Sequence, residues 1–190
     1  MNGKTITIVV PENKTVTYGV GESGTGGSIR KTGAGTLVMT DTSDEQSGFV
    51  KQYANGTVIE EGKVVLAANG QLGTGPVTIA SGARLEIADG ISISNPVSGD
   101  GTLFVDGIVT MPDGARWNVG ACSFAEGARV VVNGQTTQGV IASGVSRTDF
   151  DACFEAADGE LSWADGTVSY SNGFVWAGAE IGRASCRERV

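Results

Sequence analysis

Acidic side chains that stand close together are the residues of this sequence best suited to chemistry. Two carboxylates held ~5 to 9 Å apart can cleave a polysaccharide, one as the acid and the other as the base or nucleophile. Asp149 and Asp151 would share one face if Phe150 lies in a strand, because side chains alternate along a strand. The candidates are Asp41, Asp44 and Glu45, then Glu60 with Glu61, and finally Asp149 with Asp151.

The same carboxylates also fit a solvated surface that keeps the protein soluble. Nothing in their spacing shows that any pair converges, so we assign no catalytic residue and expect no enzyme activity. The binding residues stay undefined. A fragment of a polysaccharide-active enzyme is kept as an alternative.

The sequence excludes several kinds of site. It contains no histidine, which removes catalytic triads and histidine-ligated metals. Cys122 and Cys153 match no metal-binding spacing, and their spacing leaves a disulfide between them open. The run from Gly19 to Gly24 fits a dinucleotide-binding glycine pattern, but no helix is expected after it. We therefore predict neither a metal nor a cofactor.

The charge and hydropathy of the chain limit its partners. The net charge is −8, which argues against nucleic acid, because phosphate backbones are bound by basic surfaces. No apolar run approaches the ~20 residues of a membrane-spanning helix. We expect a monomer, with an extracellular glycan or protein as the kind of partner to consider.

The last ten residues differ from everything before them. Residues 181–190 read IGRASCRERV, with three Arg and no strand-like alternation. They resemble a translated sequencing adapter, so we treat 180–190 as a non-native read-through tail and leave it out of the fold prediction. The natural sequence is then expected to be a fragment, with its continuation before Met1 and after Glu180 undefined.

The composition predicts β structure. Among 190 residues there are 30 Gly, 22 Val, 18 Thr and 11 Ile, against 6 Leu. β-branched residues favour strands, and Gly allows sharp turns between them.

A short pattern recurs along the chain: a Gly, one or two small or polar residues, and then an apolar residue that begins an alternation. Because the strands are short and the Gly turns frequent, we predict a solenoid, a parallel β-helix of about seven or eight coils and ~35 Å in length. A β-sandwich is the alternative fold. The six copies begin at Gly35, Gly62, Gly82, Gly101, Gly114 and Gly127.

Four successive submotifs within about residues 31–87 resemble a known repeat. They are KTGAGTLVMT from Lys31, GTVIEEGKV from Gly56, NGQLGTGPVTI from Asn69 and GARL from Gly82. In this order they resemble the autotransporter-associated β-strand repeat, also called the passenger-associated repeat, of bacterial surface proteins. The resemblance implies a right-handed parallel β-helix in a secreted or cell-surface protein, and it identifies no ligand. Residues 41–55 depart from the repeat and are expected to form a loop that bulges from the rod.

The end of the natural sequence is expected to close the rod. Residues 139–179 resemble the closing segment of such passengers. Asp165-Gly166 and Asn172-Gly173 are strong hairpin turns, so we predict an antiparallel cap over 139–179 that follows repeats over 1–138. Aromatic residues such as Trp163, Tyr170 and Trp176 would cover the open end.

Three functions remain open at this point. The first, which we favour, is a structural passenger segment, a stalk that displays or spaces something on a bacterial surface. The second is an adhesin that binds a glycan or a host protein, which exposure of Phe49, Tyr53 and Trp117 on one side would favour. The third is the enzyme fragment, which converging carboxylates in a groove with Arg or Lys would favour.

Overall fold

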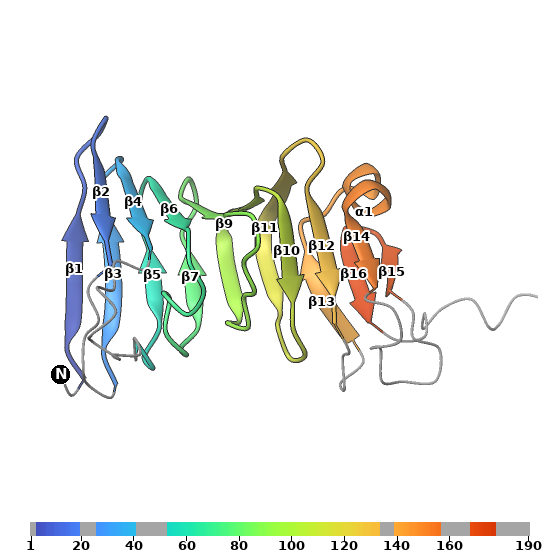
Figure 1. Ribbon diagram of the computed structural model, residues 1–190, viewed down its shortest axis with the longest axis horizontal. Helices are drawn as coiled ribbons and strands as arrows, with labels where there is room; N and C mark the ends of the chain where they lie inside the picture. Colours follow the sequence, from blue (N-terminus) through green and yellow to red (C-terminus); the bar gives the residue numbers. More distant parts are fainter. Residues whose placement is uncertain (1–2, 20–25, 41–52, 134–138, 157–167, 178–190) are drawn as a thin grey trace, which may run out of the picture.

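The computed structural model describes residues 3–19, 26–40, 53–133, 139–156 and 168–177. Nearly all of this part of the chain forms strands and turns, with a single short helix (Figure 1). The elements are β1 (Thr5–Val9), β2 (Thr15–Tyr18), β3 (Ser28–Thr32), β4 (Thr36–Met39), β5 (Thr57–Ile59), β6 (Lys63–Leu66), β7 (Val77–Ile79), β8 (Arg84–Ile87), β9 (Val97–Val105), β10 (Ile108–Met111), β11 (Trp117–Phe124), β12 (Arg129–Val132), β13 (Gly139–Ser143), α1 (Arg147–Cys153), β14 (Phe154–Ala156), β15 (Val168–Ser171) and β16 (Phe174–Ala177).

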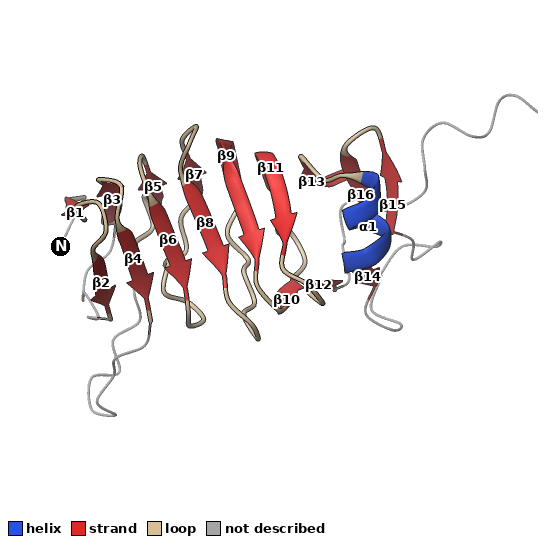
Figure 2. Cartoon of the chain, turned by 90° about the horizontal axis from the view of Figure 1, so that it is seen from above, coloured by secondary structure: helices blue, strands red, loops and turns tan. Residues whose placement is uncertain are grey.

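The strands stack in parallel as three walls of a rod (Figures 1 and 2). The first wall contains β1, β3, β5 and β7, and the second contains β2, β4, β6 and β8. The long strands β9 and β11 serve both walls, and β13 continues the first. The third wall is β10, β12 and β14. The predicted parallel β-helix is confirmed, and the β-sandwich alternative is wrong.

The register of the first wall defines the length of each coil. One position recurs at Ile6, Ile29, Thr57, Val77, Val97, Trp117 and Ala142. This makes about six turns, so the predicted seven or eight coils are too many. Ile29 and Thr57 lie further apart in the sequence than any other neighbouring pair of this column, and residues 41–52, which hold most of the expected bulging loop, lie outside the described residues. The chain leaves the coil path after β14, the last strand of the third wall, to form the end of the rod.

Alternation along each strand builds the core. The strands of the second wall repeat one burial pattern, with every second side chain buried, as in β4, β6 and β8. Leu37, Val64, Leu85 and Leu103 therefore stack in one buried column. β-branched and aliphatic side chains pack well on such a pleated surface.

The recurring Gly pattern marks strand starts, but its copies do not all lie on one wall. The copies at Gly35, Gly62, Gly82 and Gly101 lead into second-wall strands, and these four stack on one another. The copy at Gly114 leads into the first-wall part of β11, at Trp117, and the copy at Gly127 leads into β12 of the third wall. The last two copies are therefore corners within a coil rather than repeats of a whole coil.

Close backbone approach explains why two of these corners need Gly. A Cβ atom on Gly35 would lie 2.1 Å from the carbonyl oxygen of Pro11, and one on Gly101 would lie 2.4 Å from that of Ala80. Both distances are far below van der Waals contact, so any side chain would push neighbouring coils apart.

The C-terminal end of the rod is antiparallel, as predicted, but only at β15 and β16. Within the range predicted as the cap, 139–179, β13 and β14 still pair in parallel with β11 and β12. β16 pairs antiparallel with β13, and β15 pairs antiparallel with β16. The turn between β15 and β16 contains Asn172 and Gly173 with φ of 48° and 85°, as a hairpin of this kind requires. Asp165-Gly166 and Trp163 lie outside the described residues. The helix α1 was not predicted and packs beside this end (Figure 2).

Candidate functional site

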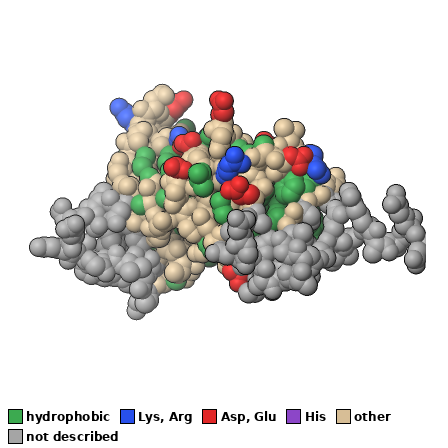
Figure 3. Space-filling view, turned by 45° about the vertical axis from the view of Figure 1, so that its right-hand side comes forward, with side chains coloured by type: hydrophobic (Ala, Val, Ile, Leu, Met, Phe, Trp, Pro, Cys, Tyr) green, Lys and Arg blue, Asp and Glu red, His purple; other side chains and the backbone are tan. Residues whose placement is uncertain are grey.

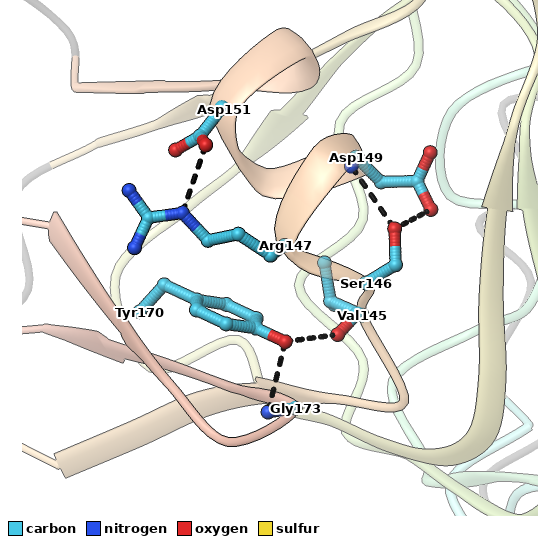
Figure 4. A network of polar contacts seen from close by, with 7 residues as sticks. All are labelled: Val145, Ser146, Arg147, Asp149, Asp151, Tyr170 and Gly173. Carbon is cyan, nitrogen blue, oxygen red and sulfur yellow. Dashed lines mark hydrogen bonds and ion pairs between the residues drawn. The ribbon is translucent and has the colours of Figure 1, made fainter.

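The structure separates the acidic pair Asp149 and Asp151. Both lie in α1, where residues two apart point to different sides, so the strand required for a shared face is absent (Figure 4). The Ser146 hydroxyl accepts a hydrogen bond from the Asp149 N–H at 3.1 Å and donates one to the Asp149 carboxylate at 2.6 Å. Asp151 instead pairs with Arg147 at 2.8 Å. Each carboxylate has a partner of its own, and the strand face on which their pairing depended is absent.

Each of the other acidic candidates either contacts a partner or lies outside the described residues. Glu60 pairs with Arg30 at 2.8 Å, and the Glu61 carboxylate accepts a hydrogen bond from the Gly33 N–H at 3.1 Å. Asp41, Asp44 and Glu45 lie outside the described residues. Within the described part of the chain, no group of three or more Cys, Asp or Glu side chains is arranged to hold a metal ion.

A mixed charge cluster on the second wall was missed by the sequence analysis. The Glu86 carboxylate forms ion pairs with Lys63 at 3.2 Å and with Arg84 at 3.1 Å. The Arg84 guanidinium carbon lies 3.8 Å from the centroid of the Phe104 ring. Parallel pairing of β6, β8 and β9 brings these side chains to one outer face. The cluster holds one carboxylate between two cations, so it offers no pair of carboxylates for glycoside cleavage.

The outer surface of the rod carries both signs of charge. Figure 3 shows Lys and Arg side chains among Asp and Glu side chains on the face that it draws. This interspersed pattern is typical of a solvated protein surface.

Lys31 is the most unusual charged residue of the rod. Its side chain is fully buried in the first-wall column between Ile8 and Ile59. Its ammonium donates hydrogen bonds to the carbonyl oxygens of Gly33, of Gly35 at 2.7 Å and of Glu61 at 2.8 Å. We call these three oxygens the carbonyl cage. Burial lowers the pKa of Lys31, and the Glu61 carboxylate acts in the opposite direction.

The carbonyl cage is a structural element that joins two coils. Residues 33 and 35 belong to one corner and Glu61 to the corner of the next coil. A buried polar group costs free energy unless it is hydrogen-bonded, and here the ammonium and the corner carbonyls satisfy one another. Asn95 acts similarly two coils later, donating to the carbonyls of Gly73 at 3.0 Å and Gly75 at 2.7 Å.

A clasp built on Tyr170 holds the C-terminal hairpin. The Tyr170 hydroxyl donates to the Val145 carbonyl at 3.1 Å and accepts from the Gly173 N–H at 3.0 Å (Figure 4). Its ring stacks on Phe150 with centroids 5.4 Å apart, and Phe150 stacks on Phe154. The predicted role of Tyr170 in covering this end therefore agrees with its contacts.

Two of the three aromatic residues that could have formed a sugar platform are buried. Tyr53 is 2 % exposed and Trp117 is 0 % exposed, and Phe49 lies outside the described residues. Phe104, on the outer face, lies beneath the Arg84 guanidinium. The described residues thus give no row of exposed aromatic rings.

Both described cysteines are buried free thiols. Burial raises the pKa of Cys122 to about 12, and the Asp149 carboxylate adds to the rise. Burial also raises the pKa of Cys153, where Asp149 acts in the same direction and Arg129 in the opposite one. Neither thiol is poised to act as a nucleophile, because the thiolate is the reactive form.

Comparison with known proteins adds no relative. No protein-family model, no curated protein and no solved structure matches the chain. Among the described residues, no helix is long and apolar enough to cross a membrane.

Proposed function

We propose that this chain is a structural passenger segment, a β-helical stalk that displays or spaces another part of a bacterial surface or secreted protein. The observation that carries the proposal is the regular rod of about six stacked turns. Its charged outer side chains pair with one another, as Arg30 does with Glu60 and Lys63 and Arg84 do with Glu86. A rod of this kind suits a spacer, because each coil contacts its neighbours and adds length.

The resemblance to the autotransporter-associated repeat supports a location on the cell surface or outside the cell. The residues that carry it span two full coils, from Lys31 in β3 to Leu85 in β8. Its Gly residues include corners where neighbouring coils touch, such as Gly35 and Gly62. The motif therefore matches the physical needs of a stacked coil.

The adhesin and enzyme alternatives have less support. An adhesin could bind through an exposed aromatic row or through the loop expected over residues 41–55. Tyr53 and Trp117 are buried, which weighs against the aromatic row, and residues 41–52 lie outside the described residues. A glycosidase needs two converging carboxylates, whereas Asp149 and Asp151 face different partners.

The proposal is tested by recovering the reading frame on both sides of the chain with long sequencing reads. A surface passenger predicts an export signal upstream, further repeats, and an outer-membrane barrel or sorting segment. A frame that continues into a catalytic domain, or that begins without an export signal, would overturn it.

A biochemical test separates the three functions. The purified chain should neither bind a glycan array nor depolymerise a panel of polysaccharides. Specific binding that Arg84→Ala abolishes, without loss of the strand circular dichroism, would favour an adhesin. The matched control is Arg129→Ala, on the third wall.

A further inference from the structure

Asn69 and Gly70 form an exposed pair at the corner of the rod that follows β6. In such a pair the Asn side-chain amide lies next to the backbone nitrogen of the following residue, so the two groups can react without first having to meet. Glycine brings no side chain that would hinder the approach. The pair therefore holds both reacting groups of a self-modification, in which the side-chain amide becomes an acid.

The nucleophile of this reaction is the Gly70 nitrogen, and its N–H is free. Among the described residues, none accepts a hydrogen bond from it. Gly70 has a φ of 73°, and a Cβ atom built on it would meet no heavy atom within 4 Å. The corner is therefore open, and water can reach the nitrogen and take its proton.

The electrophile is the side-chain carbonyl of Asn69, and the next coil polarises it. Its Oδ1 accepts a hydrogen bond from the Ser92 N–H at 2.7 Å. Attack on the carbonyl carbon moves negative charge onto Oδ1, and a backbone N–H that already points at this oxygen stabilises that charge. The stacking of the coils thus supplies a donor that the isolated Asn-Gly pair does not have.

The leaving group is the Asn69 Nδ2, which donates no hydrogen bond within the described part of the chain. The pair Asn55-Gly56 differs at both reacting nitrogens. The Asn55 Nδ2 donates to the Gly26 carbonyl, and the Gly56 N–H donates to the Tyr53 carbonyl at 3.1 Å. Its nucleophile and its leaving group are both held by other contacts.

The pair Asn172-Gly173 in the C-terminal hairpin is also held. The Gly173 N–H donates to the Tyr170 hydroxyl at 3.0 Å, so its nitrogen is not free to attack. Of the Asn-Gly pairs that the structure describes at both residues, Asn69-Gly70 alone combines a free nucleophile, a free leaving group and a donor on the carbonyl oxygen.

Asp89 shows that an acid can do the structural work of Asn69. One coil later, the Asp89 Oδ1 accepts a hydrogen bond from the Ile108 N–H at 2.7 Å, as Asn69 does from Ser92. An aspartate at position 69 would accept the same hydrogen bond, because a carboxylate oxygen is an acceptor too. The contact between the coils therefore survives the change from amide to acid.

We propose that Asn69 is a self-modification site, at which the folded rod converts this amide to an acid. The Gly70 nitrogen loses its proton and attacks the Asn69 side-chain carbonyl carbon, and a C–N bond forms. The bond to Nδ2 breaks, and Nδ2 leaves as ammonia with that proton. Water then opens the resulting cyclic imide to an aspartyl or isoaspartyl residue. This goes beyond the stalk function, since it gives one corner of the rod a slow and irreversible gain of negative charge.

The proposal is tested by incubating the full folded chain in mildly alkaline heavy-oxygen water and mapping its peptides by mass spectrometry. Asn69 should convert to a labelled acid about tenfold faster than Asn55 and Asn172. In concentrated urea, where the three pairs are released from the fold, the three rates should converge. The rate at Asn69 should be no higher in urea than in the folded chain.

An Asp89→Asn variant is the matched control. It creates an Asn-Gly pair with the same kind of donor on its carbonyl oxygen, but the Gly90 N–H donates to the Ile108 carbonyl at 2.8 Å. Position 89 of this variant should therefore convert about tenfold more slowly than Asn69. The proposal is overturned by equal rates at Asn55, Asn69 and Asn172 in the folded chain, by faster conversion of Asn69 in urea, or by conversion at position 89 as fast as at Asn69.

Discussion

Replacing the buried Lys31 by Met tests whether the carbonyl cage stabilises the rod. Met keeps an unbranched apolar side chain in the column between Ile8 and Ile59, but it donates no hydrogen bonds. The Gly35 carbonyl still accepts from the Lys63 N–H at 3.2 Å. The Gly33 and Glu61 carbonyls lose the ammonium that they share.

The expected loss follows from these contacts. Hydrogen bonds to a charged group are each worth about 1.5 to 3 kcal/mol. The variant no longer has to bury an ammonium, and this gain offsets part of their loss. Leaving a buried carbonyl without a donor costs about 1 to 3 kcal/mol, and the variant leaves two, those of Gly33 and Glu61. We therefore expect Lys31→Met to lower the free energy of unfolding by about 2 to 4 kcal/mol.

Urea unfolding followed by circular dichroism measures this change. The matched control is Lys63→Met, which removes a partly exposed lysine of the second wall and should cost less than about 1 kcal/mol. A Lys31→Met protein as stable as the parent, or more stable, would refute the reasoning, because an apolar column would then suffice without the carbonyl cage.

Three further predictions concern single side chains. Thr57 lies buried between Ile29 and Val77, and its hydroxyl has no hydrogen-bond partner in the described structure. Thr57→Val should therefore stabilise the protein by about 1 kcal/mol, measured by urea unfolding. A destabilised variant would show that the hydroxyl has a partner. Because the pKa of Cys122 rises from 9.0 to about 12, its thiolate population near pH 8 should be lower by about a thousandfold. Peptide mass spectrometry should therefore show iodoacetamide labelling of Cys122 after unfolding but not before. Labelling of the native protein at the rate of a free cysteine would contradict the burial of this thiol. Tyr170→Phe removes the hydroxyl contacts that clasp the C-terminal hairpin and should lower the stability of the hairpin by about 1 to 2 kcal/mol. The loss should appear as faster amide exchange in β15 and β16. Unchanged exchange there would mean that ring stacking alone holds the hairpin.

The fold was predictable because its causes are local and repeated. Alternating apolar residues and Gly turns predict short strands, and the Asn172-Gly173 pair predicts the final hairpin. The number of coils was less accessible, because the same Gly pattern serves corners on all three walls. Gly114 and Gly127 look like new repeats in the sequence but turn the chain within a coil.

The helix α1 was missed although the sequence carries its start signal. Ser146 is followed three residues later by Asp149, whose N–H and carboxylate both contact the Ser146 hydroxyl, so that Ser146 caps the start of the helix. We considered a strand at Phe150, as the condition under which Asp149 and Asp151 share a face, because β-favouring residues dominate the chain. A capping pair outweighed that general preference over the seven residues of α1.

The side-chain clusters could not be predicted without the register. Alternation from Ile29 does place Lys31 on the inward side, but its carbonyl partner Glu61 lies a coil away. The approach of Lys63 to Glu86 likewise depends on which strands become neighbours. Because inserted residues make the coil lengths vary, a single sequence does not show which residues become neighbours across coils.

The central claim, a rod of stackable coils, is tested most directly by removing one coil and measuring amide hydrogen exchange. Residues 77–96 form one coil, since Val77 and Val97 occupy the same position in the first wall. After their deletion, β9 should pair with β5 and β6, so peptides covering Thr57–Ile59 and Val97–Val105 should stay protected. The control deletes residues 77–86, about half a coil, and should lose that protection. Rapid exchange of these peptides in the full-coil deletion, as in the control, would contradict the account.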